Sequence, residues 1–161
     1  MNSEKIKIFI CTGNVHSGKT TKITEWANSR KRVDGILAPV VDSGRFLYRI
    51  KTKKGFLLNA GKDEKDDDII SIGHYKFNKN IFEWAQKELL KAFKLNPEWL
   101  IIDEIGFLEL RNEGLEPAVS KILENRNSTD TKLLLIIRDN LMDLAVEHYK
   151  IKSFDYTFFE F

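Results

Sequence analysis

The pattern G-x-x-x-x-G-K-[ST] occurs at Gly13, Gly18, Lys19 and Thr20, between an apolar run and a helical pattern. Glycines at these positions allow the backbone to turn tightly and to approach a phosphate group without an intervening Cβ. The Lys19 ammonium would bridge the β- and γ-phosphates of a bound triphosphate, and the Thr20 hydroxyl would bind Mg²⁺. The spacing therefore predicts a phosphate-binding loop, or Walker A motif, over residues 13–20.

The whole loop contributes to this predicted site, because its backbone N–H groups would turn inward around the β-phosphate. The N-terminus of the following helix adds a favourable dipole for an anion. The His16 side chain could touch a phosphate, although side chains at such loop positions usually point to solvent or to a partner. We expect the nucleotide to be bound by Gly13, Asn14, Val15, His16, Ser17, Gly18, Lys19, Thr20 and Thr21.

Two carboxylates, Asp103 and Glu104, follow an apolar run at residues 99–102. In a parallel sheet this strand end lies at the same edge as the phosphate-binding loop. Asp103 would hold Mg²⁺, mostly through its water shell. Glu104 points to the opposite face and would polarise a water for in-line attack on the γ-phosphate. Residues 100–104 are thus a predicted Walker B motif, although acidic residues also commonly begin solvated loops after buried strands.

The elements that must position these residues alternate along the chain. Apolar runs predict strands, and apolar positions at helical spacing predict helices. The predicted strands are 6–11, 35–41, 99–102, 133–137 and 154–161, and the predicted helices are 20–30, 78–94, 115–123 and 141–148. This alternation favours an α/β fold with a mostly parallel sheet and helices on both faces. Residues 45–59 predict an antiparallel hairpin excursion from that sheet, and 61–68 an acidic loop.

Composition limits the classes of protein that fit. The chain has 161 residues, of which 42% are hydrophobic and 31% charged, and the formal net charge is +2. These values predict a single globular domain over 1–161 and give no support to a nucleic-acid-coating or membrane-surface protein. No apolar stretch approaches the roughly 20 residues that span a bilayer. A single cysteine, Cys11, fits a reducing cytoplasm, which we expect as the location.

Several segments together resemble the small P-loop nucleoside-triphosphatase family, the group of the thermophile and the human cancer-related nucleoside-triphosphatases. The matching pieces include the loop at 13–21, Gly35, Arg45 and the run 73–75. The most specific piece is 101–110, where Asp-Glu-Ile-Gly is followed by a Glu-Leu pair. The resemblance implies a RecA-like fold and Mg²⁺-dependent hydrolysis of ATP, GTP and related triphosphates to diphosphate and phosphate.

By the same resemblance, Lys19 and Glu104 take catalytic roles, and Thr20 and Asp103 hold the metal. The sequence departs from the family at 14–17, which lacks the extra Pro or Gly of family loops. It departs again after strand 133–137, where the basic pair of the family is reduced to Arg138. Arginines that could neutralise γ-phosphate charge are Arg138, Arg45 and Arg49, with surface positions as the alternative.

Other functions of a phosphate-binding loop remain open. A small P-loop kinase would transfer the γ-phosphate to a hydroxyl acceptor, but no arginine-rich lid segment stands out between 105 and 150. A switch GTPase normally reads guanine through Asn-Lys-x-Asp, and 138–140 is Arg-Asp-Asn instead. A nucleic-acid motor lacks the basic surface. The sequence therefore favours a nucleoside-triphosphatase, and it leaves base preference, oligomeric state and protein partner undetermined.

Overall fold

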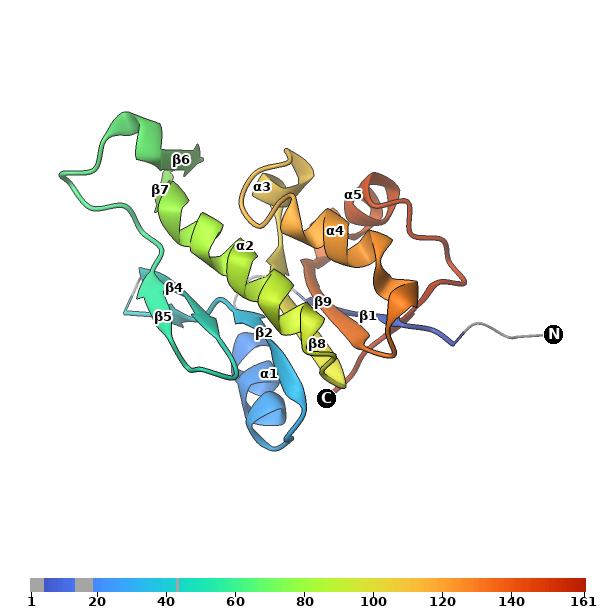
Figure 1. Cartoon of the computed structure of the whole chain (residues 1–161). Coiled ribbons are helices and arrows are strands. Elements are labelled where there is room, and N and C mark those ends of the chain that lie inside the picture. The colour runs from blue at the N-terminus through green and yellow to red at the C-terminus, as the bar shows by residue number, and fades with distance from the viewer. Residues whose placement is uncertain (1–4, 14–18, 43) are drawn as a thin grey trace.

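Parallel strands form the centre of the computed structural model, which describes residues 5–13, 19–42 and 44–161 (Figure 1). Within this described part, the main sheet has the strand order β10-β1-β9-β8-β2-β4-β3, and β5 pairs with β4. A separate two-stranded sheet consists of β6 and β7. The strands are β1 (Ile8–Gly13), β2 (Val33–Leu37), β3 (Val40–Val41), β4 (Gly44–Arg49), β5 (Gly55–Leu57), β6 (Ile69–Ile72), β7 (Tyr75–Asn78), β8 (Trp99–Ile105), β9 (Lys132–Arg138) and β10 (Tyr156–Phe158).

The direction of the strands confirms the predicted fold class. Strands β10, β1, β9, β8 and β2 run parallel to one another. Strand β4 is antiparallel to β2, β3 and β5, so the segment around 45–59 is the expected hairpin excursion. The order places β9 between β1 and β8, and the parallel strands end at one common edge.

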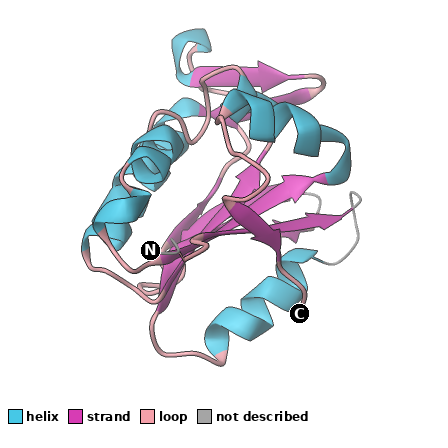
Figure 2. Ribbon diagram, turned by 90° about the vertical axis from the view of Figure 1, so that its right-hand side faces the viewer, coloured by secondary structure: helices cyan, strands magenta, loops and turns pink. Residues whose placement is uncertain are grey.

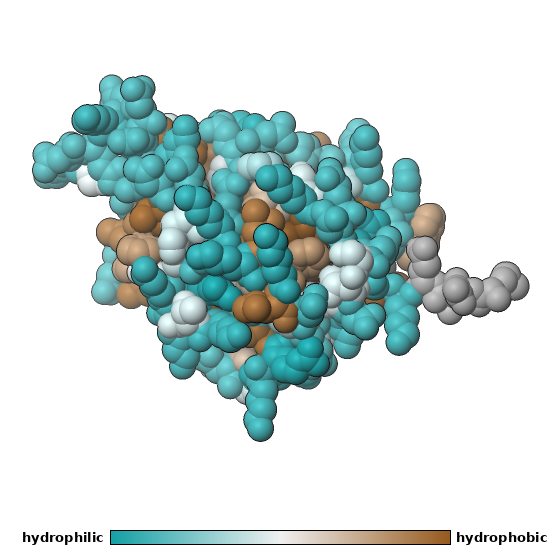
Figure 3. Space-filling model, in the orientation of Figure 1, coloured by the Kyte–Doolittle hydropathy of each residue, from teal (hydrophilic) through white to brown (hydrophobic). Residues whose placement is uncertain are grey.

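Helices cover both faces of the sheet (Figure 2). They are α1 (Lys19–Asn28), α2 (Lys79–Lys94), α3 (Phe107–Leu110), α4 (Ala118–Glu124) and α5 (Met142–His148). Helix α1 packs on one face through Ile23 and Ala27. Helices α2, α4 and α5 pack on the other face. The outer surface in Figure 3 is mostly hydrophilic, as expected for the solvent side of such covering helices.

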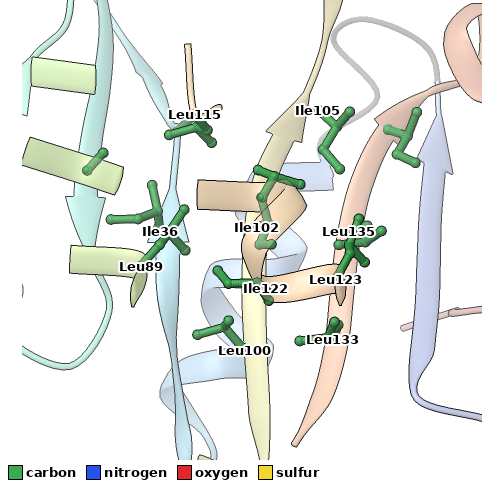
Figure 4. Packing of buried hydrophobic residues seen from close by; sticks show 14 of the residues in the cluster. Ile36, Leu89, Leu100, Ile102, Ile105, Leu115, Ile122, Leu123, Leu133 and Leu135 are labelled. Carbon is green, nitrogen blue, oxygen red and sulfur yellow. The ribbon is translucent and has the colours of Figure 1, made fainter. Parts of the chain in front are cut away.

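Alternating side chains of the central strands fill the two halves of the core. In β8, Leu100 and Ile102 belong to the cluster under α2, α4 and α5 (Figure 4). Ile101, between them, belongs to the cluster under α1. All three are fully buried. Because both faces of a parallel sheet are covered, its strands read as continuous apolar runs in the sequence, which is why β8 and β9 were readily predicted.

Several local elements differ from the sequence-based expectation. The predicted strand 35–41 is divided into β2 and β3, and the predicted last strand, 154–161, is confined to β10. Strand β8 continues to Ile105, so Asp103 and Glu104 lie within the strand and not after it. A short helix, α3, occupies 107–110. The hairpin β6–β7 follows the acidic loop and turns at Gly73, whose φ of 57° lies in the left-handed region that favours glycine. Its strands are only four residues long, so the apolar alternation in the sequence is too short to predict them. None of the described helices is long and apolar enough to cross a membrane.

Candidate functional site

The carboxyl ends of β1, β8 and β9 meet at the edge of the sheet where α1 begins. Strand β1 ends at Gly13, which pairs in register with Arg138 of β9. Helix α1 starts at Lys19, so the predicted Walker A residues connect this edge to the helix. The predicted contacts of 14–18 and of the Lys19 side chain lie outside the described residues. Thr21, also predicted to contact the nucleotide, is exposed in the first turn of α1.

Thr20 and Asp103 lie together at this edge, although they belong to a helix and a strand far apart in the sequence. The Thr20 hydroxyl donates a hydrogen bond to Asp103 Oδ2 over 3.2 Å. The backbone N–H of Ala38, just after β2, donates to the same oxygen over 3.1 Å. Asp103 shares its strand face with Ile101, and α1 packs on that face. This alternation aims its carboxylate at the first turn of α1.

The surroundings of Asp103 make its negative charge costly. The residue is 1% exposed, and this burial raises the pKa of its carboxyl to about 6, with a further rise from the charge of Glu104. The Ala38 N–H, the Arg45 charge and the Thr20 hydroxyl lower the pKa by smaller amounts. A cation bound beside Asp103 would therefore stabilise the charged form.

Asp103 and Thr20 together suit a magnesium ion that takes its other ligands from water and substrate. They are too few to hold a metal ion by protein side chains alone. Among the described residues, no group of three or more His, Cys, Asp or Glu side chains could hold a metal ion. One carboxylate and one hydroxyl are hard oxygen ligands, which suit Mg²⁺, and Mg²⁺ usually completes its shell with water and substrate phosphates. Thr20 and Asp103 are the residues that would hold it.

Glu104 occupies a different environment from its neighbour. The register of β8 against β9 shifts here, because Asp103 pairs with Ile136 and Ile105 with Ile137. Glu104 is thus the extra residue of a β-bulge, a feature that re-aims side chains next to functional sites. Its side chain is 17% exposed. The two carboxylates therefore differ in burial and in partners.

Two arginines contact the Glu104 carboxylate. Arg138 Nε donates a hydrogen bond to Glu104 Oε1 over 3.1 Å, and Arg45 Nη1 lies 3.6 Å from the same oxygen. Arg45 is anchored in β4 by its backbone N–H, which donates to Asn59 Oδ1 over 2.8 Å. Two of the three arginine candidates from the sequence are therefore at the site, on opposite sides of β8 in the strand order.

Arg49, the third arginine candidate, has a structural role. It is 6% exposed and forms a two-pronged pair with Asp34, the shortest contact being Nη2 to Oδ2 at 2.8 Å. Glu88 of α2 lies 3.8 Å from its Nη1. The expectation of a surface or phosphate-binding arginine at this position is wrong, because sheet pairing carries Arg49 away from the site and into a buried ion-pair network.

Glu109 supports the segment after β8, and sequence reasoning assigned it no role. Its Oε1 accepts a hydrogen bond from the Gly106 N–H over 2.8 Å, and its Oε2 accepts one from the Leu115 N–H over 3.0 Å. Burial raises the pKa of this carboxyl to about 7. The three-residue spacing of Gly106 and Glu109 is that of a helix capping box. This spacing is the feature of the sequence that could have indicated the role of Glu109. Glu109 thus closes the loop that begins two residues after Glu104.

Comparisons with known proteins identify the family and the fold of the chain. A family model described as NTPase matches residues 7–157. The crystal structure of THEP1 from the hyperthermophile Aquifex aeolicus superposes with a TM-score of 0.71, at 23% identity, covering 95% of this chain and 88% of that one. At this identity the structural likeness establishes the fold, which is that of a P-loop NTPase. No curated protein matches the sequence.

Proposed function

Because the chain belongs to the NTPase family, we propose that it hydrolyses nucleoside triphosphates, ATP and GTP among them, to the diphosphate and phosphate. We propose that the reaction depends on Mg²⁺. One observation carries the proposal: the hydrogen bond from Thr20 to Asp103 joins the Walker A helix to the Walker B strand over 3.2 Å. A phosphate on the loop at 13–20 and an oxygen-liganded cation would therefore meet at the same edge of the sheet.

Glu104 is the proposed general base. Hydrolysis forms a bond between the water oxygen and the γ-phosphorus as the bond from that phosphorus to the β–γ bridging oxygen breaks. Glu104 would orient the water and accept its proton, and the bridging oxygen would leave with the diphosphate. Its partial exposure supports this assignment, because an attacking water must reach the carboxylate. Bound Mg²⁺ would neutralise charge on the phosphates.

Phosphate release tests both the reaction and its base. Purified protein with Mg²⁺ and a single nucleoside triphosphate should release phosphate without any acceptor. Glu104→Gln should retain triphosphate binding and slow release by about 10² or more, the usual contribution of a general base. Arg32→Gln is a matched control, since Arg32 is exposed and lies at the opposite edge of the sheet, where its backbone oxygen accepts from Trp99 N–H.

Two outcomes would contradict the proposal. If phosphate appeared only after a nucleoside or metabolite was added, the protein would be a kinase. If Glu104→Gln turned over triphosphate as fast as the unchanged protein, Glu104 would have no role as the base.

A further inference from the structure

Two guanidinium groups share one oxygen of the proposed general base. Arg138 comes from β9 and Arg45 from β4, and these strands lie on opposite sides of β8. Both contacts are to Glu104 Oε1, at 3.1 Å and 3.6 Å. An arginine binds a carboxylate best through two parallel hydrogen bonds. Glu104 gives neither arginine that geometry: Arg138 donates a hydrogen bond through Nε alone, and the Arg45 contact is longer than a hydrogen bond.

The two arginine side chains remain within reach of a ligand. They are 27% and 29% exposed, and Glu104 is 17% exposed. Among the described residues, neither guanidinium has an ion pair with a second carboxylate. The backbone of Arg45 is held by Asn59 and Leu58, so its side chain can move while its anchor stays in place. Ion pairs between partly exposed side chains are weakened by solvent, so a stronger anion can displace them.

We propose that Arg45 and Arg138 bind the terminal phosphoryl group of the substrate, and that they cover Glu104 until a triphosphate draws them away. The inference rests on the proposed function. A γ-phosphate is a multiply charged anion with several acceptor oxygens, and it suits the arginine fork better than a shared carboxylate oxygen. When the arginines move to the phosphate, Glu104 Oε1 becomes free to accept a proton from water.

This arrangement makes the base respond to the length of the phosphate chain. A diphosphate lacks the terminal phosphoryl group, so it cannot draw both arginines from Glu104. The base is then uncovered only while a triphosphate is bound, and it is covered again once phosphate has left. In the unchanged protein, part of the binding free energy of a triphosphate is used to break the two ion pairs.

Affinity measurements on variants with uncharged glutamine side chains test whether a triphosphate draws the arginines from Glu104, an event called the exchange below. The dissociation constants of a non-hydrolysable triphosphate and of the diphosphate are measured by calorimetry with Mg²⁺. Glu104→Gln should bind the triphosphate analogue about 3- to 10-fold more tightly, since two weak ion pairs no longer oppose binding. Its affinity for the diphosphate should change less than about twofold, as should both affinities of Arg32→Gln.

The arginine variants separate this exchange from simple charge repulsion. In a protein carrying both Arg45→Gln and Arg138→Gln, the further change Glu104→Gln should improve triphosphate affinity less than about twofold. A gain as large as in the arginine-containing protein would overturn the proposal, because loss of a repelling carboxylate would then explain it. Circular dichroism confirms that each variant is folded before its affinity is compared.

Turnover supplies the second criterion. Arg45→Gln and Arg138→Gln should each lower kcat about 10-fold or more, and Arg45→Lys should restore part of the loss, because arginines near the γ-phosphate contribute strongly to catalysis. Wild-type turnover in both glutamine variants would overturn the inference. If Glu104→Gln is slow but gains no triphosphate affinity, the general base stands and the exchange is refuted. If Glu104→Gln is fast, the proposed function of Glu104 fails instead.

Discussion

Glu109 links the pH dependence of stability to the segment that follows the Walker B strand. The residue is 4% exposed, and burial raises the pKa of its carboxyl from 4.5 to about 7. The N–H donors of Gly106 and Leu115 favour the charged form, but burial has the larger effect. The folded protein therefore holds a proton on Glu109 at a pH where the unfolded chain has already released it.

The sign of the pH effect follows from this difference in proton binding. Between pH 4.5 and 7 the folded state binds more protons than the unfolded state, so the free energy of unfolding falls as the pH rises. The contribution of Glu109 is complete below pH 4.5 and is lost as the pH passes 7. At about 1.4 kcal/mol per pH unit, this loss is at most about 3 kcal/mol.

Urea unfolding followed by tryptophan fluorescence measures this loss. The free energy of unfolding is determined from pH 4.5 to 8 for the unchanged protein and for Glu109→Gln. The variant keeps the side-chain volume but cannot titrate, so the difference between the two proteins isolates Glu109. The free energy of unfolding of the unchanged protein, relative to that of Glu109→Gln, should fall by about 3 kcal/mol at most as the pH rises.

Glu113→Gln provides the control, because Glu113 lies in the same loop, has a side chain that is 42% exposed and pairs with Arg111. Its stability should parallel that of the unchanged protein at every pH. A difference for Glu109→Gln that stays constant, or that grows with pH, would refute the reasoning. In that case the two N–H donors would outweigh burial and keep Glu109 charged.

Three other residues allow independent tests. Arg49→Met should lower the free energy of unfolding by about 3–5 kcal/mol, because it leaves Asp34 buried without its partner; Asp34→Asn in the same chain should recover part of this loss. Gly114→Ala should lower the melting temperature measured by calorimetry, since Gly114 has a φ of 67° and an added Cβ would overlap with Glu109 Oε2; an unchanged melting temperature would contradict this. Thr20→Val should weaken Mg²⁺-dependent triphosphate binding, whereas Thr20→Ser should retain it; equal titration curves for both variants would exclude a metal-binding hydroxyl.

The sequence alone determined the type of fold and the place of the candidate site. Apolar runs such as 133–137 identify central strands, because a sheet covered on both faces needs apolar side chains on both faces. The motif at 13–20 is local, so its position relative to the strand and helix can be read directly. The proximity of Thr20 and Asp103 follows from one general rule, which is that parallel strands end at a common edge.

Only the tertiary structure decided which arginines reach Glu104. Arg45 and Arg49 both belong to β4 and lie four residues apart, which is about 13 Å along a strand. Pairing of Arg49 with Ile36 of β2 places one guanidinium beside Asp34, and pairing of Arg45 with Val40 of β3 places the other at the site. The register between strands is set by packing over the whole sheet. The two arginines of β4 therefore have different roles: Arg49 forms a buried ion pair in the core, and Arg45 contacts Glu104 at the site.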